Sequence, residues 1–158
     1  MLDEGFFLTV AGLAMSFAGF AGLMNALRRR GETWEPMELY QLRIIVAYAI
    51  TTLFGALLVV PFVELFGLHD GVQWLGALML VASLALGVGN MRSDLKGGHG
   101  TVLSRRVRAT FTTITVVGLI ALVGTVITGA PALYRLALIL LLAMPAGTFV
   151  YVVARINR

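Results

Sequence analysis

The side chains able to do chemistry in this sequence are few, and hydroxyl groups are the largest set among them. The chain has two histidines, His69 and His99, a single lysine, Lys96, and no cysteine. Without cysteine there is no thiol nucleophile, no disulfide and no thiolate metal site. The histidines and the lysine lie beside glycines in short polar stretches, so no apolar stretch offers an axial haem ligand or a Schiff-base amine. The sequence therefore predicts no cofactor and no metal, and it disfavours an enzyme.

Two groups of hydroxyl side chains lie within long apolar stretches and form candidate polar helix faces. The first group is Tyr48, Thr51 and Thr52, and the second includes Thr110 and Thr113. A row of hydroxyls on one face of a membrane helix could line an aqueous path. Threonine in such a helix also bonds the carbonyl four residues earlier in its own helix, and at ~100° per residue the second group points in several directions. Both interpretations stay open.

A few other polar side chains lie at the ends of apolar stretches. Glu64 and Arg135 are costly there as isolated charges, so we expect them to form an ion pair near one membrane face. The alternative is that each reaches water separately. Asn25 and Asn90 lie at the ends of two other apolar stretches, each on a face of small residues. We expect these two amides to contact each other near the opposite membrane face.

Long apolar segments must position these side chains. Apolar residues make up 59% of the chain and charged residues 13%, against ~45–50% and ~25% in globular domains. The stretch 41–66 alone is long enough to cross ~30 Å of hydrocarbon as a helix. The sequence predicts an all-α transmembrane bundle, a single domain over 1–158, with five spans at 6–27, 42–66, 72–91, 107–128 and 132–154.

Prolines and aromatic residues mark particular points within these spans. Pro61 and Pro145 each remove one helical hydrogen bond, so they are candidate hinges. Trp74, Tyr134 and Tyr151 fall near the ends of the third and fifth spans. Amphipathic aromatic rings at such positions are typical of the headgroup region, and we expect these three to anchor the spans there.

Small residues recur at helical spacing in the first and third spans. Gly12, Ser16 and Gly19 share one face of the first span, and Ser83 and Asn90 share a face with two glycines of the third. Small residues let helix backbones approach closely in lipid. These faces either form a seam between copies, which predicts a homo-oligomer, or pack within the chain.

The distribution of basic residues predicts the orientation in the membrane. Of the twelve lysines and arginines, all but Arg135 lie in the connections after the first and third spans, at the adjoining helix ends or at the C-terminus. The positive-inside rule puts that side in the cytoplasm, with the N-terminus outside. We expect a multi-pass protein of the cell membrane, in a bacterial inner membrane. The net charge of +4 follows from this topology, so no nucleic-acid partner is expected.

Three functions fit a small membrane bundle without catalytic residues. The first is an oligomeric channel or permeation protein, which the hydroxyl-bearing helices, the prolines and the small-residue faces favour. The second is a non-catalytic subunit or assembly factor of a larger membrane complex. The third is a membrane enzyme acting on lipids, with the cytoplasmic arginines holding headgroup phosphates. The bilayer, further copies of the chain and a larger complex are the expected partners.

Overall fold

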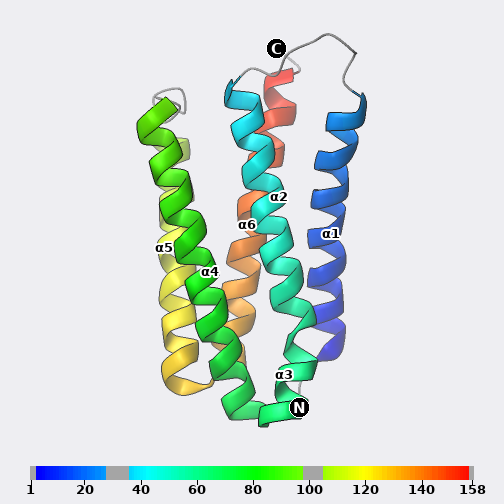
Figure 1. The fold of residues 1–158 in the computed structure, drawn as a ribbon, viewed down its shortest axis with the longest axis vertical. Coiled ribbons are helices and arrows are strands. Elements are labelled where there is room, and N and C mark those ends of the chain that lie inside the picture. The colour runs from blue at the N-terminus through cyan, green and yellow to red at the C-terminus, as the bar shows by residue number, and fades with distance from the viewer. Residues whose placement is uncertain (1–2, 28–35, 98–104, 157–158) are drawn as a thin grey trace.

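The fold is described from a computed structural model for residues 3–27, 36–97 and 105–156, and these residues form helices joined by short turns (Figure 1). The helices are α1 (Glu4–Leu27), α2 (Pro36–Leu57), α3 (Val59–Phe66), α4 (Leu68–Gly97), α5 (Arg105–Thr128) and α6 (Pro131–Ile156). No strand occurs in these ranges. The predicted all-α class is confirmed.

Five segments are long and apolar enough to cross a membrane, as the sequence predicts. They are Glu4–Met24, Glu38–Phe66, Leu68–Arg92, Ala109–Thr128 and Pro131–Tyr151. The second span runs through both α2 and α3. The protein is therefore a multi-pass helical bundle.

Pro61 explains why the second span consists of two helices. Proline has no amide hydrogen, so the carbonyl of Leu57 loses its partner one turn earlier. The chain leaves regular helix at Leu58. The amide of Leu58 still donates to the carbonyl of Phe54 at 2.9 Å, and the amide of Phe62 donates to the carbonyl of Leu58 at 3.1 Å. The interruption is local, and the span continues. By contrast, α6 runs without interruption through Pro145, whose side chain is buried.

The turn between α3 and α4 is tighter than expected. Only Gly67 is outside helix, and its φ of +82° is in the left-handed region that favours glycine. Gly71 is already in the first turns of α4, and a Cβ added to it would lie 2.6 Å from the carbonyl oxygen of Phe62. The close backbone approach at Gly71 holds the start of α4 against α3.

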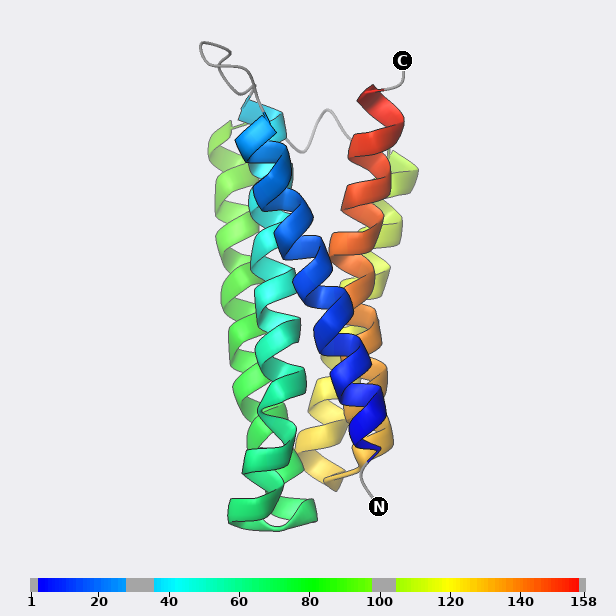
Figure 2. The same ribbon diagram turned by 90° about the vertical axis from the view of Figure 1, so that its right-hand side faces the viewer.

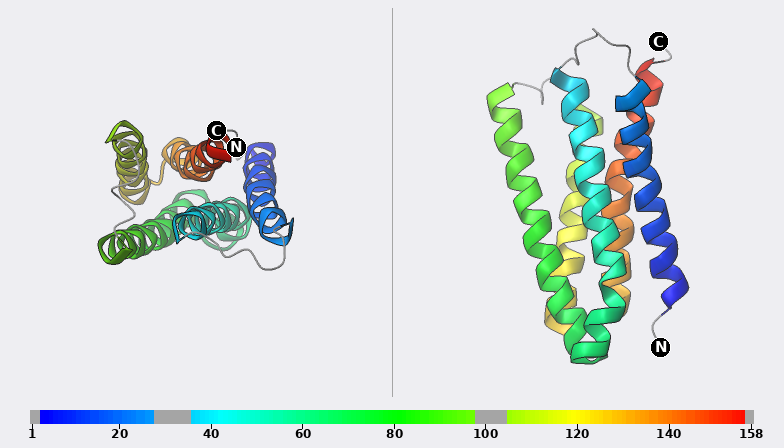
Figure 3. Two further views of the ribbon diagram at one scale, coloured as in Figure 1. Left: turned by 90° about the horizontal axis from the view of Figure 1, so that it is seen from above. Right: turned by 45° about the vertical axis from the view of Figure 1, so that its right-hand side comes forward.

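Four helices surround the interior, and α1 packs outside them. α2 contacts α4 and α6, and α5 contacts α4 and α6, so these four form a closed ring in cross-section. α1 packs against α2 and α6 (Figure 2, and Figure 3, left). The N-terminus lies at the same end as the α3–α4 and α5–α6 turns, and the C-terminus lies at the opposite end (Figure 1).

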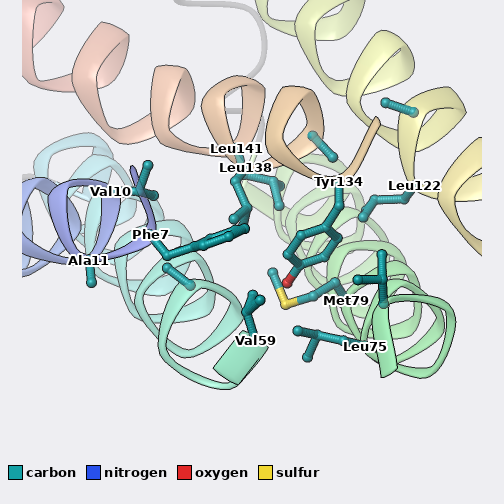
Figure 4. Packing of buried hydrophobic residues seen from close by; sticks show 14 of the residues in the cluster. Phe7, Val10, Ala11, Val59, Leu75, Met79, Leu122, Tyr134, Leu138 and Leu141 are labelled. Atoms are coloured by element: carbon teal, nitrogen blue, oxygen red, sulfur yellow. The ribbon is translucent and has the colours of Figure 1, made fainter. Parts of the chain in front are cut away.

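The core is apolar and draws on every helix. Figure 4 shows Phe7 from α1, Val59 from α3, Met79 from α4 and Tyr134 from α6 converging around one point. Gly55 makes this packing possible, since a Cβ at that position would collide with the end of the Met79 side chain. Without a side chain at Gly55, the end of the Met79 side chain packs directly against α2 there.

Candidate functional site

A small cavity halfway along the bundle is the strongest candidate site. It is lined by Tyr48 from α2, Ser83 from α4, Thr115 and Gly118 from α5, and Met144 from α6, together with apolar side chains of α5 and α6. The space open to the centre of a water molecule is about 10 Å³, which is close to the least that one water needs. Three hydroxyl-bearing residues from three helices are therefore among those that line it.

The three hydroxyls differ in their hydrogen bonding. Thr115 Oγ1 donates to the carbonyl of Phe111 at 2.9 Å and lies 3.7 Å from Met144 Sδ. The Tyr48 hydroxyl is hydrogen-bonded to the side chain of Asn90. Ser83 is only 4% exposed, and its Oγ has no hydrogen-bond partner. A buried polar group without a partner is rare and needs an explanation.

The other predicted hydroxyls mostly serve their own helices. Thr51 donates to the carbonyl of Ala47 and Thr52 to that of Tyr48, both at 2.8 Å. On α5, Thr110 and Thr113 are exposed on the bundle surface, and neither lines the cavity. Of the five residues predicted to form polar faces, the structure brings only Tyr48 to the cavity.

The sequence predicted a contact of Asn90 with Asn25, and the contact that the structure shows for Asn90 is with Tyr48. Its side chain pairs with Tyr48, which joins α4 to α2. The side chain of Asn25 lies outside the described residues, so its contact with Asn90 stays a prediction. The Tyr48–Asn90 pair extends the polar cluster from the cavity toward the C-terminal end of α4.

Glu64 and Arg135 are not brought together as an ion pair among the described residues. Glu64 is exposed on α3. The guanidinium of Arg135 lies 5.7 Å from the ring centroid of Phe6 and 5.9 Å from that of Phe7, within cation–π range. Its Nε is buried and has no hydrogen-bond partner. Arg135 therefore joins α6 to α1, whereas the sequence predicted a link from α6 to the second span.

Tyr134 is a correction to the sequence analysis. It was expected to anchor α6 at the headgroups, but it is 1% exposed, and its hydroxyl donates to the carbonyl of Gly55 at 2.7 Å. The reason is that its ring meets a bare backbone at Gly55, which offers an acceptor inside the bundle. Trp74, by contrast, is 63% exposed.

Sequence reasoning also missed the importance of Ser83, which it treated as a small residue on a contact face. Within the described residues, no group of three histidine or carboxylate side chains could hold a metal ion. No protein-family model matches the chain, and no curated protein or solved structure is significantly similar to it.

Proposed function

We propose that the protein is a non-catalytic membrane subunit that works by associating with other membrane helices through α1, and that its first partner is a second copy of itself. The observation that supports this is a line of small residues on α1 that nothing in the described chain covers. It consists of Gly5, Thr9, Gly12, Ser16 and Gly19, and all five are exposed.

These residues alternate in steps of four and three, so they form one stripe along the helix. The side of α1 that packs on the bundle carries Phe7, Val10, Ala14 and Ala21. At ~100° per residue the small-residue stripe lies opposite that side. It therefore faces lipid in a single copy of the chain.

Some glycines elsewhere in the bundle, such as Gly76 and Gly124, have contacts that account for them, whereas Gly87 and Gly89 of α4 have none within 4 Å of an added Cβ. A Cβ would lie 2.9 Å from Thr125 Cγ2 at Gly76, and 2.9 Å from a Leu133 carbon at Gly124. At Gly12 and Gly19 of α1, nothing lies within 4 Å of an added Cβ. Close packing inside the chain therefore explains Gly76 and Gly124, but it does not explain the glycines of α1.

The stripe is suited to packing rather than to conduction. Thr9 donates to the carbonyl of Gly5 at 2.7 Å, and Ser16 donates to that of Gly12 at 2.8 Å. The hydroxyls are therefore satisfied within α1, and the surface presents backbone and methylene groups. Such a surface gains dispersion contact when a second helix approaches closely.

A channel or permeation protein is the second candidate, and the meeting of three hydroxyl-bearing side chains at the cavity favours it. The cavity holds about one water, so a path through one bundle would require the helices to separate. A path between copies is the other arrangement. Flux of ions or small solutes into proteoliposomes tests both arrangements, and no flux above that of empty liposomes removes this candidate.

We propose that the protein lies in the cell membrane in the orientation that the positive-inside rule favours, with the N-terminus outside and the C-terminus in the cytoplasm. The arrangement fits spans that cross the membrane in alternate directions, because the α3–α4 and α5–α6 turns lie together at the N-terminal end of the bundle (Figure 3, right). The connections 28–35 and 98–104 lie outside the described residues.

The absence of cysteine from the sequence makes disulfide trapping a direct test of the association. Ser16→Cys places one thiol on the stripe, and Met15→Cys places one on an adjacent exposed face of the same helix. A disulfide forms only when the two Cα atoms come within ~7 Å. Under mild oxidation in membranes we expect a covalent dimer from Ser16→Cys and little from Met15→Cys.

Equal trapping at both positions, or none at either, would contradict association of two copies through this stripe. A cross-link to a different protein at Ser16→Cys, without the dimer, would overturn the second copy as the partner of α1 and identify that other protein as its partner. The mass of the cross-linked product is therefore measured together with its yield.

A further inference from the structure

Arg135 brings a positive charge to the end of the bundle at which the N-terminus lies. It is the only lysine or arginine in the segments that meet there, which are 3–9, 59–75 and 125–137. We propose that Arg135 binds the phosphate group of a membrane phospholipid at the junction of α6 and α1. This inference does not depend on the association of two copies through α1.

The charge of Arg135 has no counterion within the part of the chain that the structure describes. Arginine stays protonated in proteins, and Arg135 belongs to the span Pro131–Tyr151, where an uncompensated charge is costly. The acidic residues at this end of the bundle are exposed, and none of them pairs with Arg135: they are Asp3, Glu4, Glu64 and Asp70. The anion that neutralises Arg135 must therefore come from outside these residues.

Two phenylalanine rings of α1 hold the guanidinium in place. Its central carbon lies 5.7 Å from the ring centroid of Phe6 and 5.9 Å from that of Phe7, distances at which a ring attracts a cation. The rings are neutral, so the charge remains. Nε is buried without a hydrogen-bond partner, whereas the side chain as a whole is only partly buried. A ligand therefore meets the two Nη groups rather than Nε.

The depth of Arg135 decides which anion is near it. Arg135 is the fifth residue of α6, which begins at Pro131, so its Cα lies about 6 Å along the helix axis from the first residue. Each headgroup layer of a bilayer is ~5–8 Å thick and borders the hydrocarbon in which the spans lie. A long side chain one turn into a span reaches the phosphates of this layer.

The chemistry of the junction favours a phospholipid over free phosphate. Guanidinium and phosphate form two parallel hydrogen bonds, so a phosphate group of either source matches the Nη groups. The surface next to Arg135 is apolar, because Leu136, Ile139 and Leu8 are exposed. Ile139 lies one turn deeper in the membrane than Arg135, on the same side of α6. The acyl chains of a phospholipid can pack on this surface, and inorganic phosphate cannot use it.

Lipid binding by the purified full-length chain tests the proposal. The protein is delipidated in a neutral detergent without phosphate, and phosphatidylcholine is added, since a zwitterionic lipid is drawn less than an anionic one to the basic residues of the opposite end. Native mass spectrometry gives the affinity for the first lipid bound. We expect Arg135→Gln to weaken this affinity by about tenfold, because charged hydrogen bonds to the phosphate are lost. Arg43→Gln, which removes an exposed arginine of α2, is the control and should leave it unchanged.

Two milder variants keep the charge and carry the test if Arg135→Gln does not fold. Arg135→Lys lacks the planar fork, and Phe6→Leu removes one ring that holds the guanidinium. We expect both to bind phosphatidylcholine more weakly than the wild type. Phe17→Leu, whose ring lies 6.0 Å from that of Phe149 and not beside Arg135, is the matched control on α1. Unchanged affinity in Arg135→Gln, or in both milder variants, would overturn the proposal.

Two further probes separate the possible sources of binding. Diacylglycerol with the same acyl chains lacks the phosphate, and we expect it to bind more weakly than phosphatidylcholine in the wild type and equally in Arg135→Gln. Equal binding of the two lipids by the wild type would mean that only the chains are recognised. Inorganic phosphate should compete poorly with phosphatidylcholine. If it competes well and only when Arg135 is present, the site holds free phosphate, and the assignment to a phospholipid is wrong.

Discussion

The hydroxyl of Tyr134 donates a 2.7 Å hydrogen bond to the backbone carbonyl of Gly55. The bond joins α6 to α2 three residues before α2 is interrupted at Leu58. Tyr134 is 1% exposed, and a buried tyrosine hydroxyl requires a partner. The bond and the ring together fix α6 against the part of the second span that is least regular.

Removing that hydroxyl should destabilise the bundle. We expect Tyr134→Phe to lower the free energy of unfolding by about 1 kcal/mol, because hydrogen bonds between membrane helices contribute ~0.5–2 kcal/mol each. Unfolding by SDS from mixed micelles, followed by circular dichroism, measures the change.

Tyr151→Phe is the matched control for this prediction. Tyr151 belongs to the same helix and is only partly buried, so its replacement should change the unfolding free energy much less. If the two variants unfold alike, the Tyr134–Gly55 bond does not contribute as we infer.

Alanine at two glycines should have opposite consequences for folding and association. Gly71→Ala would place a methyl group 2.6 Å from the backbone carbonyl oxygen of Phe62, and we expect it to cost about 1–3 kcal/mol of stability, as overpacking does. Gly12→Ala meets nothing within 4 Å in one copy, so the single bundle should keep its stability. We expect Gly12→Ala to weaken dimers instead, measured by disulfide trapping in the Ser16→Cys background. A fall in stability for Gly12→Ala with dimers unchanged would argue against the α1 stripe.

The position of Arg135 over two phenylalanine rings predicts an energetic coupling between α6 and α1. A double-mutant cycle of Arg135→Gln with Phe6→Leu should give about 0.5–2 kcal/mol, the range of cation–π contacts. Glu64→Gln should have little effect, since Glu64 is exposed. The outcome that would restore the predicted ion pair is loss of stability in Glu64→Arg and its recovery on adding Arg135→Glu.

The orientation of the chain can be read from single cysteines. Asp70→Cys lies at the α3–α4 end, and His99→Cys lies in the connection between α4 and α5. We expect a membrane-impermeant maleimide added to intact cells to label Asp70→Cys, and to label His99→Cys only after the membrane is opened. The reverse pattern would place the N-terminus inside.

The spans could be predicted from the sequence because length and apolarity alone decide them. The choice of buried face could not. Phe7 is 3% exposed and its neighbour Leu8 is 65% exposed, although both are strongly apolar. In a membrane the surface that faces lipid is as apolar as the core, so the hydrophobic pattern does not show how each helix is rotated.

Partners between helices depend on that rotation, and this is why the site was predicted only in part. Tyr48 and Asn90 could be recognised as polar residues of facing spans, but their pairing required the rotation of α2 and α4. Arg135 and Tyr134 are neighbours in sequence and point toward different elements, α1 and α2 respectively. No spacing rule within one span distinguishes these two directions.

The α3–α4 turn has a consequence for the order in which the chain folds. Gly67 is the single residue outside helix there, and Gly71 brings the two backbones into contact close to the turn. These contacts are local in sequence, so closing them costs little chain entropy. The second and third spans can therefore pair as a hairpin during synthesis, while α5 and α6 are still in the ribosome. The later spans then pack against this hairpin.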